Sequence, residues 1–448
     1  MMYRFLIIVV CFCSVNLTST KRIEYLPGFQ GPLPFHLETG YVGVDVNEDI
    51  QLFYYFIQSE SNPKEDPVLL WLTGGPGCSS ISGLVYQIGP LGFEEVPYNG
   101  SLPTLIPKAY SWTKMASIIF LDIPVDTGFS YAKSTRNIHS TDVQYFDHAH
   151  EFMRKWFKRN PEFSSNPFYV SGDSYSGIPV PVITQLISDG NEVGSKPYIN
   201  LKGYILGNPL TFSEAVNYQI RFANGMGLIS DEIYKSLSQS CSGEYRLGYI
   251  NPNNIECVQN VELFQECIDG IKAEDVLEPY CGDTKLRIQL PNQIRSKDAL
   301  YCQFDRKDLV NYWANDAGVR EALGIRKGSV GNWIRCNYEF LNYTVTLNDV
   351  RPYHLNLSNK DYRSLIYSGD HDMSIPHQST QAWIKDLNHT VIDQWQPWKL
   401  HGQIAGYTES YLNGMTFATV KGAGHIATEY KPEECYTMFK RWMNYQPL

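Results

Sequence analysis

Beyond its N-terminus, the 448-residue chain has no apolar run near the roughly 20 residues that a membrane-spanning helix needs. It also lacks an excess of basic residues, since 37 Lys and Arg face 47 Asp and Glu, a formal net charge of −10. This balance argues against nucleic acid or an anionic membrane as the main partner. No internal repeat or low-complexity block is visible either. We therefore expect a globular mature protein without a membrane span.

The N-terminus does contain a short apolar run. Arg4 precedes residues 5–13, which are apolar, and small polar residues follow at Ser19 and Thr20. The run is too short to span a bilayer, and its flanks are typical of a secretory signal peptide over residues 1–20 rather than of a buried N-terminal strand. The sequence therefore predicts entry into the secretory pathway, with secretion and vacuolar delivery both open.

The cysteines agree with an oxidising compartment. Hydrophobic residues make up 43% of the chain, so a chain of this length can fold without disulfides. Two of the ten cysteines lie in the predicted signal peptide, and an even number remains, which favours disulfides whose pairing the count leaves open. None has the paired C-x-x-C spacing of a zinc site, so we expect no metal. Glycosylation sequons, usable on exposed loops, occur at Asn99, Asn342, Asn356 and Asn388.

The first half of the chain alternates predicted strands with helices. Residues 50–57, 68–72, 117–121 and 168–171 are apolar or β-branched runs bounded by turn residues, as buried strands are. Residues 142–158 have helical apolar spacing, and Thr141 with Gln144 can form a capping box. This alternation predicts an α/β protein with a mostly parallel sheet flanked by helices.

The middle of the chain differs. From residue 213 to 350 the strand pattern fades, cysteines cluster and helical stretches appear, for example at 316–323 before Gly324. We interpret this region as an inserted, disulfide-bonded cap on a core formed by residues 21–212 and 351–448. Within the cap, the polar segment 284–298 is predicted to be an exposed loop open to proteolysis.

A candidate nucleophile follows the predicted strand at 168–171. In GDSYSG, at residues 172–177, Ser174 is flanked by the small residues that a strained strand-to-helix turn requires. The usual pattern is G-x-S-x-G, and Ser176 stands here at the last position. By itself the stretch is also compatible with an ordinary turn that happens to contain a serine.

Two further turns supply partners for this serine. SGDHD, at residues 368–372, and GAGH, ending at His425, each follow a predicted strand, and the order Ser, Asp, His is that of α/β-hydrolases. His425 would accept the Ser174 proton, and an aspartate would orient the imidazole. From the residues alone, Asp370 and Asp372 both remain candidates for that aspartate.

A glycine-rich turn precedes these motifs. TGGPGCSS, at residues 73–80, follows the predicted strand 68–72 and can aim backbone N–H groups at a developing oxyanion. A phosphate-binding loop is excluded because no G-K-[ST] follows and Pro76 has no N–H donor. His148 and His150 are two positions apart on a predicted helix and therefore make a poor metal pair.

Together these motifs resemble the serine carboxypeptidase family. WLTGGPGCSS at 71–80, LDIPVDTGFSY at 121–131 and the three catalytic turns carry the resemblance, which extends from about residue 30 to the C-terminus. It implies an α/β-hydrolase fold, an acyl-enzyme mechanism and no cofactor or metal. It also implies that Asp372 is the triad member, that Gly75 and Tyr175 supply the oxyanion N–H groups, and that Cys78 pairs with Cys336.

The sequence departs from the peptidases of this family where they bind a substrate's C-terminal carboxylate. Those enzymes have asparagine at the position of Thr73 and glutamate at the positions of Gln87 and Asp173. A site built to hydrogen-bond one group loses orders of magnitude in rate when its partners no longer match. Thr73, Asp173 and the stretch 425–432 instead resemble the plant serine carboxypeptidase-like acyltransferases. Asp126, which replaces a glycine of the second motif, has no functional account from sequence.

These observations leave three hypotheses. The favoured one is acyl transfer from a glucose ester to an alcohol acceptor, in which the bound acceptor outcompetes water. The alternative is a serine-type carboxypeptidase that releases C-terminal residues from peptides. The third is an inactive binding protein on the same scaffold, which the complete set of catalytic motifs disfavours.

Overall fold

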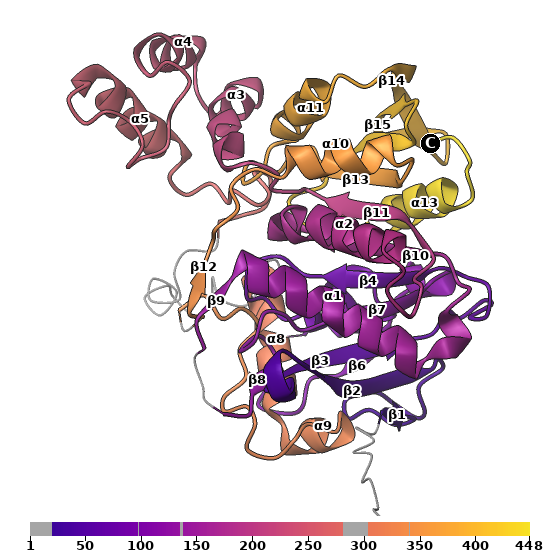
Figure 1. Ribbon diagram of the computed structural model, residues 1–448. Helices are drawn as coiled ribbons and strands as arrows, with labels where there is room; N and C mark the ends of the chain where they lie inside the picture. Colours follow the sequence, from indigo (N-terminus) through magenta and orange to yellow (C-terminus); the bar gives the residue numbers. More distant parts are fainter. Residues whose placement is uncertain (1–19, 97, 135–137, 281–302, 340) are drawn as a thin grey trace, which may run out of the picture.

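The computed structural model describes residues 20–96, 98–134, 138–280, 303–339 and 341–448 (Figure 1). The predicted signal peptide, apart from Thr20, and the polar segment 284–298 lie outside this part of the chain. None of the helices in the described ranges is long and apolar enough to cross a membrane.

The described residues form a central sheet of 12 strands. In order across the sheet the strands are β1 (Lys21–Ile23), β2 (Leu37–Val44), β3 (Ile50–Ile57), β7 (Ser117–Leu121), β4 (Val68–Leu72), β10 (Phe168–Asp173), β11 (Leu201–Gly207), β13 (Arg363–Gly369), β16 (Met415–Val420), β15 (Gln403–Tyr411) and β14 (Val391–Leu400), with β8 (Tyr131–Ala132) paired to β3. Two small ribbons pair β5 (Leu91–Phe93) with β6 (Leu105–Pro107) and β9 (Ser140–Thr141) with β12 (Tyr343–Thr344).

The centre of the sheet is parallel and its margins are antiparallel. Strands β7, β4, β10, β11, β13 and β16 run parallel to one another, while β1 to β3 on one side and β14 and β15 on the other add antiparallel pairs, including β3 with β7 and β15 with β16. The predicted mostly parallel sheet is confirmed. The carboxyl ends of β4, β10, β13 and β16 therefore meet at one edge of the sheet, where α/β proteins place their sites.

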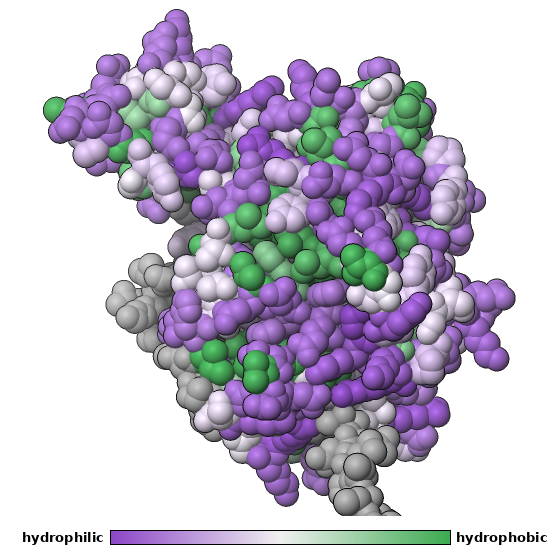
Figure 2. Space-filling model, in the orientation of Figure 1, coloured by the Kyte–Doolittle hydropathy of each residue, from purple (hydrophilic) through white to green (hydrophobic). Residues whose placement is uncertain are grey.

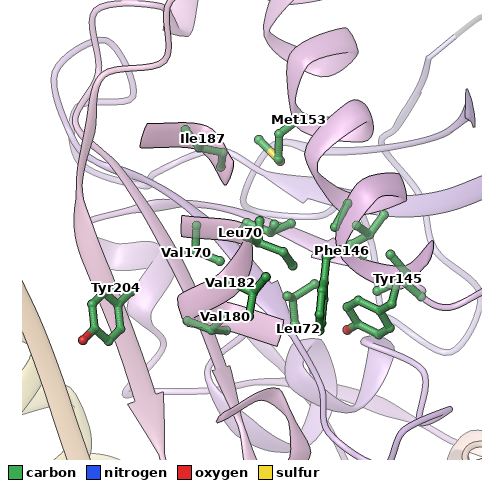
Figure 3. Packing of buried hydrophobic residues seen from close by; sticks show 14 of the residues in the cluster. Leu70, Leu72, Tyr145, Phe146, Met153, Val170, Val180, Val182, Ile187 and Tyr204 are labelled. Carbon is green, nitrogen blue, oxygen red and sulfur yellow. The ribbon is translucent and has the colours of Figure 1, made fainter. Parts of the chain in front are cut away.

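Helices cover one face of this sheet. These are α1 (Asp142–Arg159), α2 (Pro179–Glu192), α10 (Arg351–Asn359) and α11 (His377–Asp386). Figure 3 shows Met153 of α1 and Ile187 of α2 packed over Leu70 and Val170, and all four side chains are inaccessible to solvent. The predicted helix at 142–158 is confirmed, and the Thr141–Gln144 capping box holds its first turn.

The opposite face is rich in tryptophan. Trp112 stacks on Phe439 with ring centroids 4.1 Å apart, which joins the sheet to α13 (Pro432–Met443), a helix that follows the short α12 (Ala427–Tyr430). Trp313 of α8 (Gln303–Asn315) and Val319 of α9 (Ala317–Ala322) join the same cluster. Because the central strands are buried on both faces of the sheet, their sequences are unbroken apolar runs.

A separate cluster of helices projects from the core. Helices α3 (Tyr218–Gly225), α4 (Asp231–Ser240) and α5 (Ile255–Ile268) stand out at the upper left of Figure 1 and share their own apolar centre. The Cys241–Cys257 disulfide ties α4 to α5. Two helices of the range 213–350, which was predicted to be a cap, pack on the core instead: α8 and α9. The name cap is therefore used below for the helices α3, α4 and α5 alone.

The surface shown in Figure 2 is mostly hydrophilic, and its apolar side chains gather near the centre, where α1 and α2 lie in Figure 1. Exposed apolar side chains are common in globular proteins, because more than half of a folded protein's accessible surface comes from apolar atoms.

Candidate active site

Ser174 lies on a strained turn between β10 and α2. Its φ is 59°, in the left-handed region that side chains seldom adopt, and such strain clusters at functional sites. A Cβ on Gly172 would lie 2.4 Å from Leu72 O, and one on Gly177 would lie 2.3 Å from Leu210 O, so only glycine fits at either position. The turn therefore has the geometry of a nucleophile elbow.

His425 connects the serine to an aspartate. Its Nε2 lies 2.8 Å from Ser174 Oγ, and its Nδ1 lies 2.7 Å from Asp372 Oδ2. Because an ionised carboxylate only accepts hydrogen bonds, Nδ1 carries the proton, which leaves Nε2 free to accept the Ser174 proton. Asp370, the other candidate, instead accepts a hydrogen bond from Gly422 N at 2.7 Å and so braces the turn that leads to His425.

Asp372 is fully buried, and its charge is compensated by donors. Its Oδ1 accepts hydrogen bonds from Ser374 N at 2.8 Å and from Ile375 N at 3.2 Å. Its Oδ2 accepts one from Asn208 Nδ2 at 2.8 Å in addition to the one from His425. These partners keep the carboxylate oriented towards the imidazole.

The pKa of His425 is raised above its ordinary value. Burial opposes the imidazolium, but the charge of Asp372 and its hydrogen bond favour it, and the charges of Asp173 and Glu274 add to that effect. A raised pKa suits an imidazole that must hold a proton during turnover and then release it.

Asn208 is a member of this site that the sequence analysis missed. It follows β11 with a φ of 44°, its N–H donates to Tyr367 O at 2.7 Å, and its Oδ1 accepts from Gly369 N at 3.2 Å. It therefore joins the turn after β13 to Asp372. The available signal was a polar residue directly after an apolar strand in the middle of the parallel sheet.

The glycine-rich turn packs directly against the elbow. A Cβ on Gly74 would lie 2.6 Å from Ser174 Cβ and 2.9 Å from Tyr175 N, so a side chain there would displace the nucleophile. This contact places the turn containing Gly75 beside Ser174 and Tyr175, where an oxyanion hole belongs in this fold. The side chain of Tyr175 is held by Asp142, which accepts its hydroxyl hydrogen bond and that of Tyr343.

Asp122 anchors the far end of the glycine-rich turn. The buried carboxylate accepts hydrogen bonds from Ser79 Oγ at 2.6 Å, Ser80 N at 2.9 Å and Phe129 N at 2.9 Å. A Cβ on Gly128 would lie 2.1 Å from Asp122 Oδ2, which accounts for that glycine. Burial raises the pKa of Asp122 to about 6. The glycine-rich turn at residues 73–80 and the motif at residues 121–131 thus pack together as one unit.

The Cys78–Cys336 disulfide, expected from the family resemblance, is present and fixes the other side of the turn. Asn337 N donates to Gly77 O at 2.9 Å, and Ser79 N donates to Arg335 O at 2.8 Å. Asp126 has a φ of 66°, which explains why glycine is usual at that position, and its carbonyl accepts from Asn337 Nδ2 at 2.9 Å.

The three residues that depart from the peptidases lie beside the elbow. Asp173 is buried, with Oδ1 accepting from Gly74 N at 3.1 Å and Oδ2 from Gln87 Nε2 at 2.8 Å. Burial raises the pKa of Asp173 to about 6. Gln87 ends a single π-helical turn, and Thr73 is buried next to Gly74. The structure therefore places a carboxylate, an amide and a hydroxyl next to the nucleophile.

The other predicted sites are more dispersed. Asn99, Asn342, Asn356 and Asn388 are all exposed. Cys267 and Cys435 have no disulfide partner among the described residues, while Cys281 and Cys302 lie outside them. No cluster of His, Cys, Asp and Glu side chains in the described ranges could hold a metal ion.

The fold is that of an α/β-hydrolase, and Ser174, His425 and Asp372 have the mutual geometry that a serine, histidine and aspartate triad requires. Comparison with known proteins is more specific. The serine carboxypeptidase family matches residues 27–445. Serine carboxypeptidase-like 11 of Arabidopsis thaliana is 50% identical over 99% of both chains, and serine carboxypeptidase-like 5 of the same plant is 52% identical over 97% of this chain and 94% of its own.

Among solved structures, a prohormone-processing carboxypeptidase from Saccharomyces cerevisiae, Kex1(Δ)p, shares the fold with a TM-score of 0.72 and 18% identity, over 94% of this chain and 95% of its own. The chain belongs to the serine carboxypeptidase family, and it is an enzyme of the carboxypeptidase-like hydrolase or acyltransferase class.

The structure predicts that Asn208 supports catalysis without touching substrate. Asn208→Gly removes the amide and retains a residue that adopts positive φ freely. A lost hydrogen bond to a charged group costs about 1.5–3 kcal/mol, so we expect kcat to fall about 10- to 150-fold with little change in KM. Steady-state kinetics would measure this, and Asn200→Gly, at a partly buried side chain outside the site whose amide donates to Ser165 O, is the control. Wild-type kcat in Asn208→Gly would contradict the role.

Proposed function

We propose that this enzyme transfers an acyl group from a glucose ester to an alcohol acceptor through an acyl-enzyme on Ser174. The observation that carries the proposal is the set of unpaired polar atoms beside the elbow. Thr73 Oγ1 and Gln87 Oε1 are both buried, and neither has a hydrogen-bond partner within the described part of the chain. Leaving such a group unpaired costs about 1–3 kcal/mol, so each is a candidate contact for substrate.

These atoms fit a hydroxyl better than a carboxylate. Gln87 donates its amide N–H to Asp173 and is left with an acceptor oxygen, which would repel a carboxylate. Above pH about 6, Asp173 is itself anionic and buried, which also disfavours a second carboxylate. A sugar or acceptor hydroxyl can donate to Gln87 Oε1 and accept from Thr73 Oγ1.

In the first half-reaction, Ser174 Oγ attacks the ester carbonyl while His425 Nε2, 2.8 Å away, takes the hydroxyl proton. The N–H groups of Gly75 and Tyr175 would stabilise the oxyanion of the tetrahedral intermediate. When the intermediate collapses, the bond to the sugar oxygen breaks, and His425 returns the proton to that oxygen. Glucose leaves, and Ser174 carries the acyl group.

In the second half-reaction, His425 removes the proton of the acceptor hydroxyl, whose oxygen attacks the acyl carbonyl. Collapse releases the new ester, and the proton returns from His425 to Ser174 Oγ. Water can enter the same step, so a bound acceptor must have a high effective concentration at the acyl group. No metal or organic cofactor takes part in these steps.

One observation favours carboxypeptidase activity as a second candidate. With a pKa of about 6, Asp173 is a carboxylic acid under more acidic conditions and could then donate a hydrogen bond to a peptide's C-terminal carboxylate. On that reading, peptide release would rise as the pH falls through about 6. The intact contact between Ser174 and His425 argues against the third hypothesis, an inactive binding protein.

We also propose that the protein is secreted or vacuolar. The Cys78–Cys336 and Cys241–Cys257 disulfides support an oxidising compartment, and the N-terminal segment has the composition of a signal peptide. The exposed sequons at Asn99, Asn342, Asn356 and Asn388 would then be open to glycosylation.

The proposal predicts ester formation when the protein is offered acyl-glucose donors together with alcohol acceptors. Mass spectrometry of the products should show the new ester, and blocked dipeptides offered at acidic pH should stay uncleaved. The Ser174→Ala variant should form no product. Efficient dipeptide cleavage without transfer would contradict the proposal, and inactivity towards both, with Ser174 unreactive to a fluorophosphonate, would indicate a binding protein.

A second prediction concerns the residues beside the elbow. Thr73→Asn, Gln87→Glu and Asp173→Glu combined should raise carboxypeptidase activity at acidic pH, because they restore the groups with which the family's peptidases hold a carboxylate. One recovered hydrogen bond to a charged group is worth about 1.5–3 kcal/mol, so we expect at least a tenfold gain in kcat/KM for dipeptides. Thr113→Asn, at a buried threonine outside the site, is a control for folding. No gain in a folded triple variant would refute the carboxylate argument.

A further inference from the structure

A segment next to the cap lies against both catalytic turns. Residues 272–278, called the strap here, follow α5 along the chain. Ala273 O accepts hydrogen bonds from Met373 N at 2.8 Å and Ser374 N at 3.0 Å, on the turn that carries Asp372. Glu274 O accepts one from His425 N at 2.6 Å. The strap thus binds the backbone of the triad histidine and of the residues directly after the triad aspartate.

The contact with the histidine turn is tight. A Cβ on Gly424 would lie 2.4 Å from Glu274 O and 2.6 Å from Asp275 Cβ, so only glycine allows the strap to approach His425 this closely. Val276 N also donates to His371 O at 3.2 Å, which adds a second contact to the aspartate turn. A shift of the strap would therefore move both turns.

An ion pair closes the strap at its two ends. Lys272 Nζ lies 2.6 Å from Glu278 Oε2, and the two side chains are only 11% and 9% exposed. The Tyr430 hydroxyl donates to Glu278 at 2.8 Å, and Tyr430 ends α12, the helix that begins just after His425. The ion pair and the Tyr430 hydrogen bond connect the two ends of the strap to each other and to the helix after His425, so this pair is a sensitive point of the strap.

The strap also joins the triad to the cap. Met373, the residue after Asp372, is 1% exposed and belongs to the apolar centre of α3, α4 and α5, as does Val276 of the strap. The side chain next to the catalytic carboxylate is therefore part of the cap's core. Packed interiors transmit displacements rather than absorb them.

We propose that the strap is a positioning element of the triad, with Glu278 as the residue that holds it closed. Glu278 touches neither Ser174 nor a reacting atom, and it acts through the backbone contacts of Ala273 and Glu274. The inference rests on the Ser174, His425 and Asp372 chemistry and is independent of which substrate the enzyme takes.

The test variant is Glu278→Gln, which keeps an oxygen for the Tyr430 hydroxyl and removes the negative charge that pairs with Lys272. The readout is the rate at which a fluorophosphonate labels Ser174, because this measures the triad without knowledge of the substrate. We expect the second-order rate to fall at least ~10-fold while labelling still goes to completion. The acid limb of the rate against pH should also shift by about half a unit or more, because the charges around His425 move relative to its imidazole.

The matched control is Glu244→Gln. Glu244 pairs with Arg246 at 2.5 Å beside the cap helices. Within the described part of the chain, the polar contacts of these two side chains lie with Glu214, Asn217 and Tyr249, away from the catalytic turns. We expect its labelling rate and acid limb to match those of wild type even where its thermal stability falls. Tyr430→Phe, which removes the hydroxyl that donates to Glu278 and keeps the ion pair, should give a smaller slowing of about 2- to 5-fold.

A merely structural role gives a different pattern. If Glu278→Gln lowers thermal stability or the fraction of protein that can be labelled, while the folded fraction keeps the wild-type rate and acid limb, the proposal is wrong. Should Glu278→Gln fail to fold, Tyr430→Phe decides the question, and a wild-type rate and acid limb in that variant would overturn the proposal. A failure of acyl transfer in product assays has no bearing on this result.

Discussion

The buried carboxylate of Asp372 is the group on which the rest of the site depends. It accepts hydrogen bonds from the imidazole of His425, the amide of Asn208 and the backbone N–H groups of Ser374 and Ile375. A carboxyl group buried without such partners would ionise only at a large cost in free energy. Without the carboxylate, the imidazole of His425 would lose both its tautomer and its orientation. Much of the surrounding structure serves to deliver these donors.

The sheet supplies them because its central strands are parallel. Strands β10, β11, β13 and β16 all end at one edge, and the residues that follow them are Ser174, Asn208, the turn to Asp372 and the turn to His425. The glycine-rich turn after β4 comes to the same edge and is fixed by the buried carboxylate of Asp122. Each catalytic group is thus a short turn on a rigid strand end, which keeps the geometry preorganised.

Local patterns predicted the fold well. The strands at 50–57, 68–72 and 117–121 and the capped helix after Thr141 depend on apolar spacing and turn residues, which are visible in the sequence. The roles of Asp372, Gly75 and Tyr175, and the Cys78–Cys336 pairing, came from the family resemblance. Within the range 213–350, however, α8 and α9 pack on the core rather than beside the projecting helices, and sequence spacing carries no information on which surface a helix packs against.

Two kinds of feature were not predicted from the sequence. Asn208 acts through one side-chain amide directly after β11, a strand whose sequence carries no motif, and the neighbouring position of β11 and β13 brings it to Asp372. The strap acts through backbone carbonyls, which any residue type can supply, so residues 273 and 274 have no distinctive signature. Side-chain chemistry leaves a pattern in the sequence, whereas backbone contacts between distant segments do not.

The most direct test of the central claim is to trap the covalent intermediate and follow its fate. The enzyme is mixed with an acyl-glucose, quenched in acid at short times and digested, and the peptides are analysed by mass spectrometry. The account predicts an acyl adduct on Ser174 that decays faster as alcohol acceptor is added and yields ester rather than free acid. An adduct that yields only free acid at every acceptor concentration, or the absence of any adduct on Ser174 while product forms, would contradict it.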